Sequence, residues 1–177
     1  MQTQSNPEQN STTQLPLIPR ETLFGNPERS RPQLSPDGQH LALIAPDAKN
    51  VLQVWLRTTE GDRQLTADAK RGIRSYFWTY DGQHLIYMQD ADGDENFHCY
   101  AVNIHTNIVR DLTPFEGVKA DPIELDPDYP DQFLIGMNQN DPQVFDVYRV
   151  SLSDGTVTFD TANPGNIMSW LADPQFQ

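Results

Sequence analysis

Short apolar runs separated by polar turns fill most of the chain, and no stretch beyond ten residues repeats its apolar positions at helical spacing. These runs have the length of strands and are bounded by Gly, Pro, Asn and Asp, which favour turns. Strands are expected at 41–44, 51–57, 73–78, 85–89, 97–104, 109–112, 133–137, 145–152 and 157–159, with a short one ending at Leu65. The pattern predicts an all-β protein.

The expected strands recur in three copies of one sequence pattern. The copies read LSPDGQHLALI at 34–44, WTYDGQHLIYM at 78–88 and LDPDYPDQFLIG at 125–136. Their turn aspartates, Asp37, Asp81 and Asp128, lie 44 and 47 residues apart. A repeat of this length that is filled with short strands is typical of β-propeller blades. We therefore predict a partial β-propeller of about three four-stranded blades plus the start of a fourth.

Two further sets of residues recur at nearly the same spacing in all three copies. The aromatic residues that follow the turn aspartates by 18, 19 and 20 positions are Trp55, Tyr100 and Tyr148. The apolar residues that come 10, 12 and 11 positions later are Leu65, Leu112 and Phe159. Because insertions accumulate in turns, such spacing indicates equivalent positions in successive blades.

Composition divides the chain into three regions. Residues 1–14 are polar and predict a disordered tail. Residues 15–33 form an extended lead-in, whose apolar residues among prolines indicate either a segment that docks onto a surface or a linker that crosses the first blade. The incomplete propeller occupies 34–177, with blades at about 34–72, 73–120 and 121–162 and a stub at 163–177.

The turn residues have structural explanations. In the first copy Pro36 presets φ, Asp37 bonds the backbone after it and Gly38 accepts a positive φ, so the turn aspartates are not read as catalytic carboxylates. His40 and His84 occupy equivalent repeat positions, which favours a structural or surface role.

The net charge of the chain limits the classes of molecule that we expect it to bind. The 177 residues carry a formal net charge of −13, which disfavours nucleic acid and anionic membranes as partners. No apolar run has the length of a membrane span, and residues 1–14 lack the features of a secretory signal, so we expect a cytoplasmic protein. The single cysteine, Cys99, excludes an intramolecular disulfide framework and is expected to pack in a strand.

One acidic loop resembles a calcium site. Asp90, Asp92 and Asp94 alternate as the oxygen ligands of an EF-hand loop do. The match then fails, since Glu95 stands where the turn needs Gly and Ala101 where a bidentate Glu is expected. We predict a polar hairpin loop and no metal, with these aspartates as the metal candidates that the sequence offers.

Catalytic and cofactor motifs are missing from the sequence. It contains no G-x-S-x-G, H-E-x-x-H, C-x-x-C, phosphate-binding loop or dinucleotide fingerprint. We predict no catalytic residues and no cofactor in this chain.

Several motifs together resemble the propeller domain of the prolyl oligopeptidase family of serine peptidases, in its acylaminoacyl-peptidase or dipeptidyl-peptidase-like branch. The motifs are I-P-R-E at 18–21, L-F-G-N-P at 23–27, S-P-D-G at 35–38, D-G-D-E-N at 92–96, D-L-T-P at 111–114 and N-P-G at 163–165. S-P-D-G also occurs in Tol-type propellers, whereas the lead-in together with D-G-D-E-N is more specific. The resemblance covers the chain from Leu15 to its end.

The resemblance implies a propeller that sits over an α/β-hydrolase domain and restricts the access of peptides to a Ser-Asp-His triad in that domain. We therefore expect a non-catalytic N-terminal propeller fragment from a truncated or split reading frame, inactive alone. Its expected partner is a separately encoded hydrolase half, or a second copy, because an open array of blades exposes apolar faces at its ends.

Two alternatives remain open. The chain could be a stand-alone interaction module that holds a protein or peptide through aromatic residues, although packing between sheets is the favoured role for these residues. They are Trp55, Phe77, Trp78 and Tyr100. The other alternative is an acidic calcium-binding domain.

Overall fold

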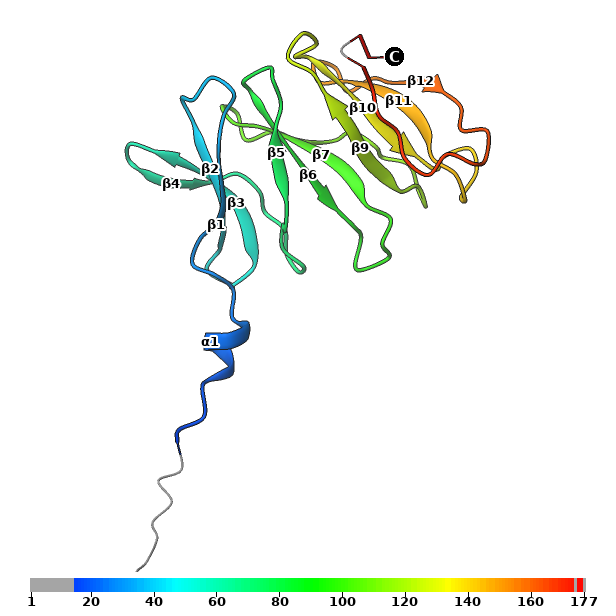
Figure 1. Cartoon of the computed structure of the whole chain (residues 1–177). Helices are drawn as coiled ribbons and strands as arrows, with labels where there is room; N and C mark the ends of the chain where they lie inside the picture. The colour runs from blue at the N-terminus through cyan, green and yellow to red at the C-terminus, as the bar shows by residue number, and fades with distance from the viewer. Residues whose placement is uncertain (1–14, 174, 177) are drawn as a thin grey trace, which may run out of the picture.

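The computed structural model describes residues 15–173, 175 and 176, and the predicted tail at 1–14 lies outside them. The chain there forms three four-stranded antiparallel sheets, each a meander of consecutive strands, which stand side by side in an arc (Figure 1). The first sheet holds β1 (Ser30–Leu34), β2 (Leu41–Pro46), β3 (Leu52–Thr58) and β4 (Gly61–Gln64). The second holds β5 (Tyr76–Trp78), β6 (His84–Gln89), β7 (His98–Asn103) and β8 (Val109–Asp111). The third holds β9 (Ala120–Leu125), β10 (Gln132–Met137), β11 (Asp146–Ser151) and β12 (Val157–Thr161).

The all-β, partial-propeller prediction is confirmed, and strand register shows the repeat directly. Each predicted aromatic landmark lies on the third strand of its sheet, opposite a residue of the second strand: Trp55 opposite Leu43, Tyr100 opposite Tyr87 and Tyr148 opposite Ile135. The three blades are therefore built on one pairing scheme.

The predicted equivalence of Phe159 with Leu65 and Leu112 is wrong by one position. Phe159 pairs with Tyr148, whereas the residues opposite Trp55 and Tyr100 are Gln64 and Asp111. Successive strand residues point to opposite faces, so this one-residue offset turns the side chain away from the core. Phe159 is 50% exposed, while Leu65 and Leu112 are buried.

The lead-in contains regular structure that its composition did not predict. A short helix, α1 (Arg20–Phe24), buries none of its residues, and Leu17 and Phe24 remain 95% and 78% exposed. Within the described residues this segment therefore does not dock its apolar side chains onto the blades. Asn26 connects it to the first blade by donating to the Asn50 carbonyl oxygen (2.9 Å). The first strand, β1, then begins inside the segment expected to be extended.

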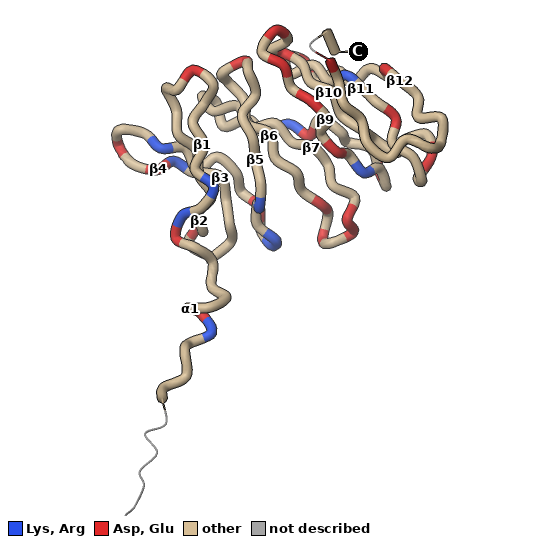
Figure 2. The backbone as a smooth tube through the Cα atoms, viewed as in Figure 1, with Lys and Arg blue, Asp and Glu red and all other residues tan. Residues whose placement is uncertain are grey.

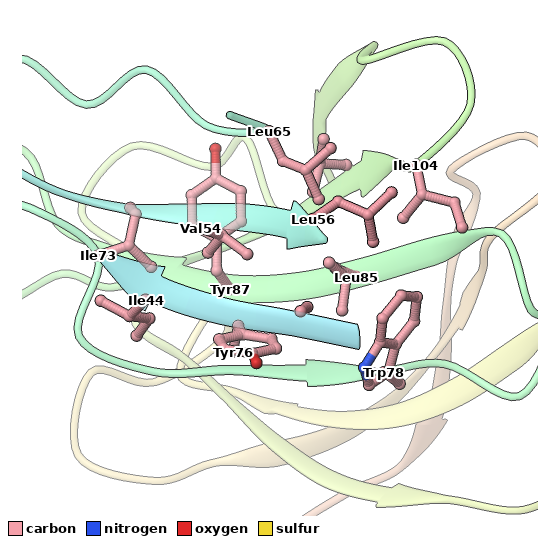
Figure 3. Packing of buried hydrophobic residues seen from close by; sticks show 12 residues of the cluster. Ile44, Val54, Leu56, Leu65, Ile73, Tyr76, Trp78, Leu85, Tyr87 and Ile104 are labelled. Carbon is pink, nitrogen blue, oxygen red and sulfur yellow. The ribbon is translucent and has the colours of Figure 1, made fainter. Parts of the chain in front are cut away.

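The hydrophobic core lies between sheets. Side chains of the first and second blades interlock in one cluster, to which Ile44, Val54, Tyr76 and Leu85 belong (Figure 3). A second cluster joins the second and third blades through residues such as Ile86 and Phe133. Since each blade buries its faces against its neighbours, stacking of blades supplies most of the apolar burial.

The outward face of the third blade is covered by the chain itself. Phe176 is 1% exposed, packs with Leu134 and Val147, and stacks on Tyr129 with ring centroids 4.8 Å apart. The Trp170 indole N–H donates to the Phe145 carbonyl oxygen (2.9 Å). An apolar face exposed at this end was expected. The expected self-association stays a prediction, and it now depends on this covering segment, residues 163–173, 175 and 176.

Candidate functional site: a basic pocket on the lead-in face

One face of the propeller arc is where the lead-in joins β1. The turn at 47–51, the link at 65–75 and the loop at 90–97 lie on the same face, because strands of a meander alternate in direction (Figure 1). We call it the lead-in face.

A pocket of about 450 Å³ opens on this face between the first and second blades. Its charged lining consists of Arg31, Lys70, Arg71 and Arg74, and we call it the basic pocket. The whole chain has 12 Lys and Arg residues against 25 Asp and Glu, so a third of its cations gather at this one pocket. Figure 2 shows blue segments near the lower ends of β1 and β5, with red ones on the neighbouring β6–β7 loop.

The link at 65–75 is held in one conformation by hydrogen bonds. The Asp68 carboxylate accepts from the backbone N–H groups of Lys70 (3.1 Å) and Gly72 (2.6 Å). The side chain of Gln53, which is fully buried, donates to the Asp68 carbonyl oxygen (2.7 Å) and accepts from its N–H (3.0 Å). Gly72 has φ +74°, and a Cβ there would lie 2.9 Å from the Leu52 nitrogen. The position of the basic residues on this link is therefore fixed by the backbone.

The acidic loop holds these cations instead of forming a metal cluster. Asp92 pairs with Lys70 (2.5 Å), and Asp90, whose side chain is 2% exposed, pairs with Arg71 (3.4 Å). Asp94 accepts from backbone N–H groups of its own loop, at Ala91 (3.2 Å) and Asn96 (3.1 Å). The three metal candidates thus have separate partners, and the described residues contain no cluster of three His, Cys, Asp or Glu side chains that could hold a metal ion.

Arg31 and Arg74 differ from the other two cations of the pocket. Both are exposed, and within the described part of the chain neither guanidinium group has a hydrogen bond or ion pair. Arg31 adopts φ 51° at an irregularity in the pairing of β1 with β2, and its carbonyl oxygen accepts from the Tyr76 hydroxyl (2.7 Å). The sequence analysis missed this pocket, because Arg31 precedes the other three cations by 39 to 43 residues and only the packing of two blades joins them.

The turn aspartates act as the sequence predicts in the first two blades. Asp37 accepts from the Gln39 N–H (3.0 Å) and Asp81 from the Gln83 N–H (2.8 Å), which are the predicted backbone bonds. Each carboxylate also accepts from the hydroxyl two residues before it, that of Ser35 or Thr79. In the third blade the prediction is wrong: Asp126 accepts from the Asp128 N–H (2.8 Å), and the Asp128 side chain is exposed. In the third blade Asp126 stands at the position of Ser35 and accepts the hydrogen bond of the turn itself. The aspartate that stabilises this turn therefore lies two residues earlier than predicted.

His84 and His98 pair with aspartates within the second blade, and Cys99 of the same blade is buried. Asp81 pairs with His84 (2.5 Å) and Asp111 with His98 (2.8 Å). Burial alone would raise the pKa of Asp81, but hydrogen bonds from His84, Thr79 and the Gln83 N–H outweigh it and lower this pKa to about 2. Cys99 is fully buried, and burial raises the pKa of its thiol, which disfavours the reactive thiolate.

The aromatic residues considered for partner binding are used in packing. The indole N–H groups of Trp55 and Trp78 donate to the carbonyl oxygens of Ala45 (2.9 Å) and Gln33 (3.2 Å). Phe77 packs in the cluster between the second and third blades, and Tyr100 stacks on a neighbouring tyrosine at 5.3 Å.

Comparison with known proteins identifies the parent family. No protein-family model matches the chain. Dipeptidyl aminopeptidase BIII from Pseudoxanthomonas mexicana is 42% identical to it over 163 residues, which are 90% of this chain and 24% of that protein. The chain is homologous to the N-terminal propeller part of prolyl oligopeptidase family peptidases. Dipeptidyl peptidase family member 6 from Caenorhabditis elegans is 32% identical over 145 residues, covering 77% of this chain and 20% of that protein. The propeller therefore spans about a quarter or less of the curated relatives it matches.

Solved structures agree on the fold. The β-propeller domain of the Trilobed protease from Pyrococcus furiosus superposes with a TM-score of 0.54 at 18% identity, covering 76% of this chain and 44% of that one. The acylaminoacyl peptidase from Pyrococcus horikoshii gives 0.51 at 16% identity, covering 76% and 25%. TolB from Acinetobacter baumannii gives 0.53 at 17% identity, covering 84% and 36%. At these identities the likeness concerns the propeller architecture alone.

Among the described residues, no helix is long and apolar enough to cross a membrane.

Proposed function

We propose that these blades belong to a propeller that gates the access of peptides to the α/β-hydrolase domain of a prolyl oligopeptidase family peptidase. The observation that carries the proposal is the 42% identity with a dipeptidyl aminopeptidase over 90% of this chain. In this role the propeller makes no bond to the reacting atoms and acts by limiting what reaches them.

The hydrogen bonding of the histidines supports a non-catalytic role for the blades. The ring nitrogens of His84 bond to Asp81 and Asn103, and His98 bonds to Asp111. No serine in the described part of the chain donates to either ring, so the nucleophile–base contact of a serine hydrolase is not formed there. The hydrolase domain, in the same polypeptide or in a separate one, is the proposed partner.

Peptidase assays with and without the blades test the proposal. The coding sequence that supplies the hydrolase domain is expressed together with this chain, as one polypeptide or as two, and compared with the hydrolase domain alone. We expect the assembly to cleave dipeptidyl p-nitroanilides and short peptides, and to cleave a 30-residue peptide at least about tenfold less efficiently in kcat/KM than the isolated domain does.

Equal kcat/KM for long and short peptides in both preparations would contradict gating. Hydrolysis by the 177-residue chain alone would contradict its non-catalytic role. A stable monomer that binds no hydrolase domain would favour the stand-alone interaction module. The cytoplasmic location expected from the sequence is part of the same proposal, and fractionation of the source cells checks it.

A further inference from the structure

We propose that the basic pocket binds the carboxylate of a peptide, either its C-terminal carboxylate or an acidic side chain, between Arg31 and Arg74. The identification of the ligand as a peptide rests on the proposed gating function. The affinity for a carboxylate rests on the pocket alone.

The charge balance of the pocket indicates an anionic ligand. Asp90 and Asp92 neutralise Arg71 and Lys70, which leaves Arg31 and Arg74 without counter-charge among the described residues. Two unpaired cations in one pocket repel each other. They remain unpaired although the chain has 25 Asp and Glu residues against 12 Lys and Arg. A bound anion between them would remove this repulsion.

The backbone at Arg31 supports a binding role for its side chain. A residue other than glycine at φ 51° is held in a sparsely populated conformation, and such positions cluster at ligand sites. Irregularities in strand pairing redirect a side chain in the same way. Three bonds between β1 and β5 hold the conformation: Tyr76 Oη to the Arg31 oxygen (2.7 Å), Gln33 Nε2 to the Tyr76 oxygen (3.2 Å) and Trp78 Nε1 to the Gln33 oxygen (3.2 Å).

The remaining wall of the pocket is held by contacts within the chain. Arg71 passes so close to Gly93 that a Cβ on that glycine would lie 2.3 Å from Nη1 of Arg71. The link that holds Lys70 and Arg71 is fixed by Asp68 and Gln53, as described above. A preformed site loses little conformational entropy when a ligand binds.

The size of the pocket and the negative electrostatic field of the chain favour a carboxylate over larger anions. A volume of about 450 Å³ accommodates the end of a short peptide. The net charge of −13 repels polyanions such as nucleic acid, whereas a single carboxylate interacts mainly with the nearest cations. The planar guanidinium groups of arginine match the geometry of a carboxylate.

Isothermal titration of the full 177-residue chain at low salt tests the site. The ligands are tetra-alanine with a free C-terminus, tetra-alanine amide, and N-acetyl-Ala-Glu-Ala amide. We expect at least about tenfold tighter binding of the peptide with a free C-terminus, or of the glutamate peptide, than of tetra-alanine amide, and the stronger of the two identifies the source of the carboxylate. Raising the salt concentration should weaken the binding.

Charge-removing variants decide whether the pocket is responsible. Arg74→Gln and Arg31→Asn should each weaken carboxylate binding about tenfold, and asparagine is chosen because it tolerates positive φ. Arg20→Gln removes the same charge from α1 at a position that does not line the pocket, and it should leave the affinity unchanged.

Three results would overturn the proposal: no binding of either carboxylate ligand at millimolar concentration, equal binding of tetra-alanine amide, or unchanged affinity in Arg74→Gln. The Arg74 side chain makes no bond in the described part of the chain, so this variant remains decisive if Arg31→Asn does not fold. The titration involves no peptidase activity. A negative result therefore leaves gating intact, and a failure of gating leaves carboxylate binding intact.

Discussion

At the scale of single residues, the turn at Asp81 shows how much a carboxylate contributes to the stability of a blade. Asp81 accepts hydrogen bonds from Thr79, Gln83 and His84, and its pKa is lowered to about 2 from an ordinary value of 3.8. A lowered folded-state pKa means stability that is present above pH 3.8 and is lost as the pH falls towards 2.

Asp81→Asn should therefore destabilise the chain by about 1–2 kcal/mol at pH 7, and the difference from wild type should shrink as the pH falls below 3.8 towards 2. Urea denaturation at pH 7, 4 and 2.5 measures this. Asp128→Asn is the matched control, because in the third blade Asp126 accepts the turn hydrogen bond, and its stability should equal that of wild type. An equal loss in both variants would contradict the assignment of the turn.

Gly72 provides a second prediction at this scale. Both Gly72 and Gly38 have positive φ, +74° and +71°, but only Gly72 has backbone atoms where a Cβ would lie. Gly38→Ala should cost about 1 kcal/mol from backbone strain, and Gly72→Ala about 1–3 kcal/mol more because the link must move. Thermal unfolding of both variants measures the difference, and equal melting temperatures would show that the close approach to Leu52 is unimportant.

At the scale of elements, the sequence predicts the central strands of each blade better than the first strands of the first and third blades. The runs that form β2, β6 and β10 are rich in apolar residues and bury at least half of their residues, so their pattern is visible in the sequence. In β1 the sequence SRPQL has one apolar residue, and β9 carries a proline. These strands are specified by bonds to neighbouring strands and blades, such as Tyr76 to Arg31, and no local pattern encodes such contacts.

The basic pocket was missed for the same reason, since it forms only when two blades stack. The acidic loop was correctly expected to be a hairpin between strands, but its partners Lys70 and Arg71 precede it by about 20 residues and were not considered. Turn chemistry is local and was predicted well in the first two blades. The third blade differed because Asp126 offered a competing carboxylate.

Helix α1 should contribute little to the stability of the blades. Leu23 and Phe24 are 58% and 78% exposed, so the double variant Leu23→Gln/Phe24→Gln should change the free energy of unfolding by less than about 0.5 kcal/mol. Leu85 is fully buried between the first two blades, so Leu85→Ala should lower the free energy of unfolding by about 2–5 kcal/mol. Urea denaturation compares the two, and a large loss in the double variant would show that the lead-in packs on the propeller.

At the scale of the whole molecule, the open arc raises the question of what protects its ends. Segment 163–176 covers the third blade through Phe176, while Leu171, in the same segment, is 89% exposed. Phe176→Ala should uncover Leu134 and Val147 and promote self-association. Size-exclusion chromatography with light scattering should show a rise in mass that depends on concentration. Leu171→Ala, the control, should elute as wild type does, and identical elution of Phe176→Ala would contradict a protective role.

The covering segment also bears on how the chain could meet a partner. Trp170 and Phe176 pack on the outward face of the third blade, so a second copy or a further blade could stack on this face only after they move aside. The Tyr129–Phe176 contact would then set how readily that face is uncovered.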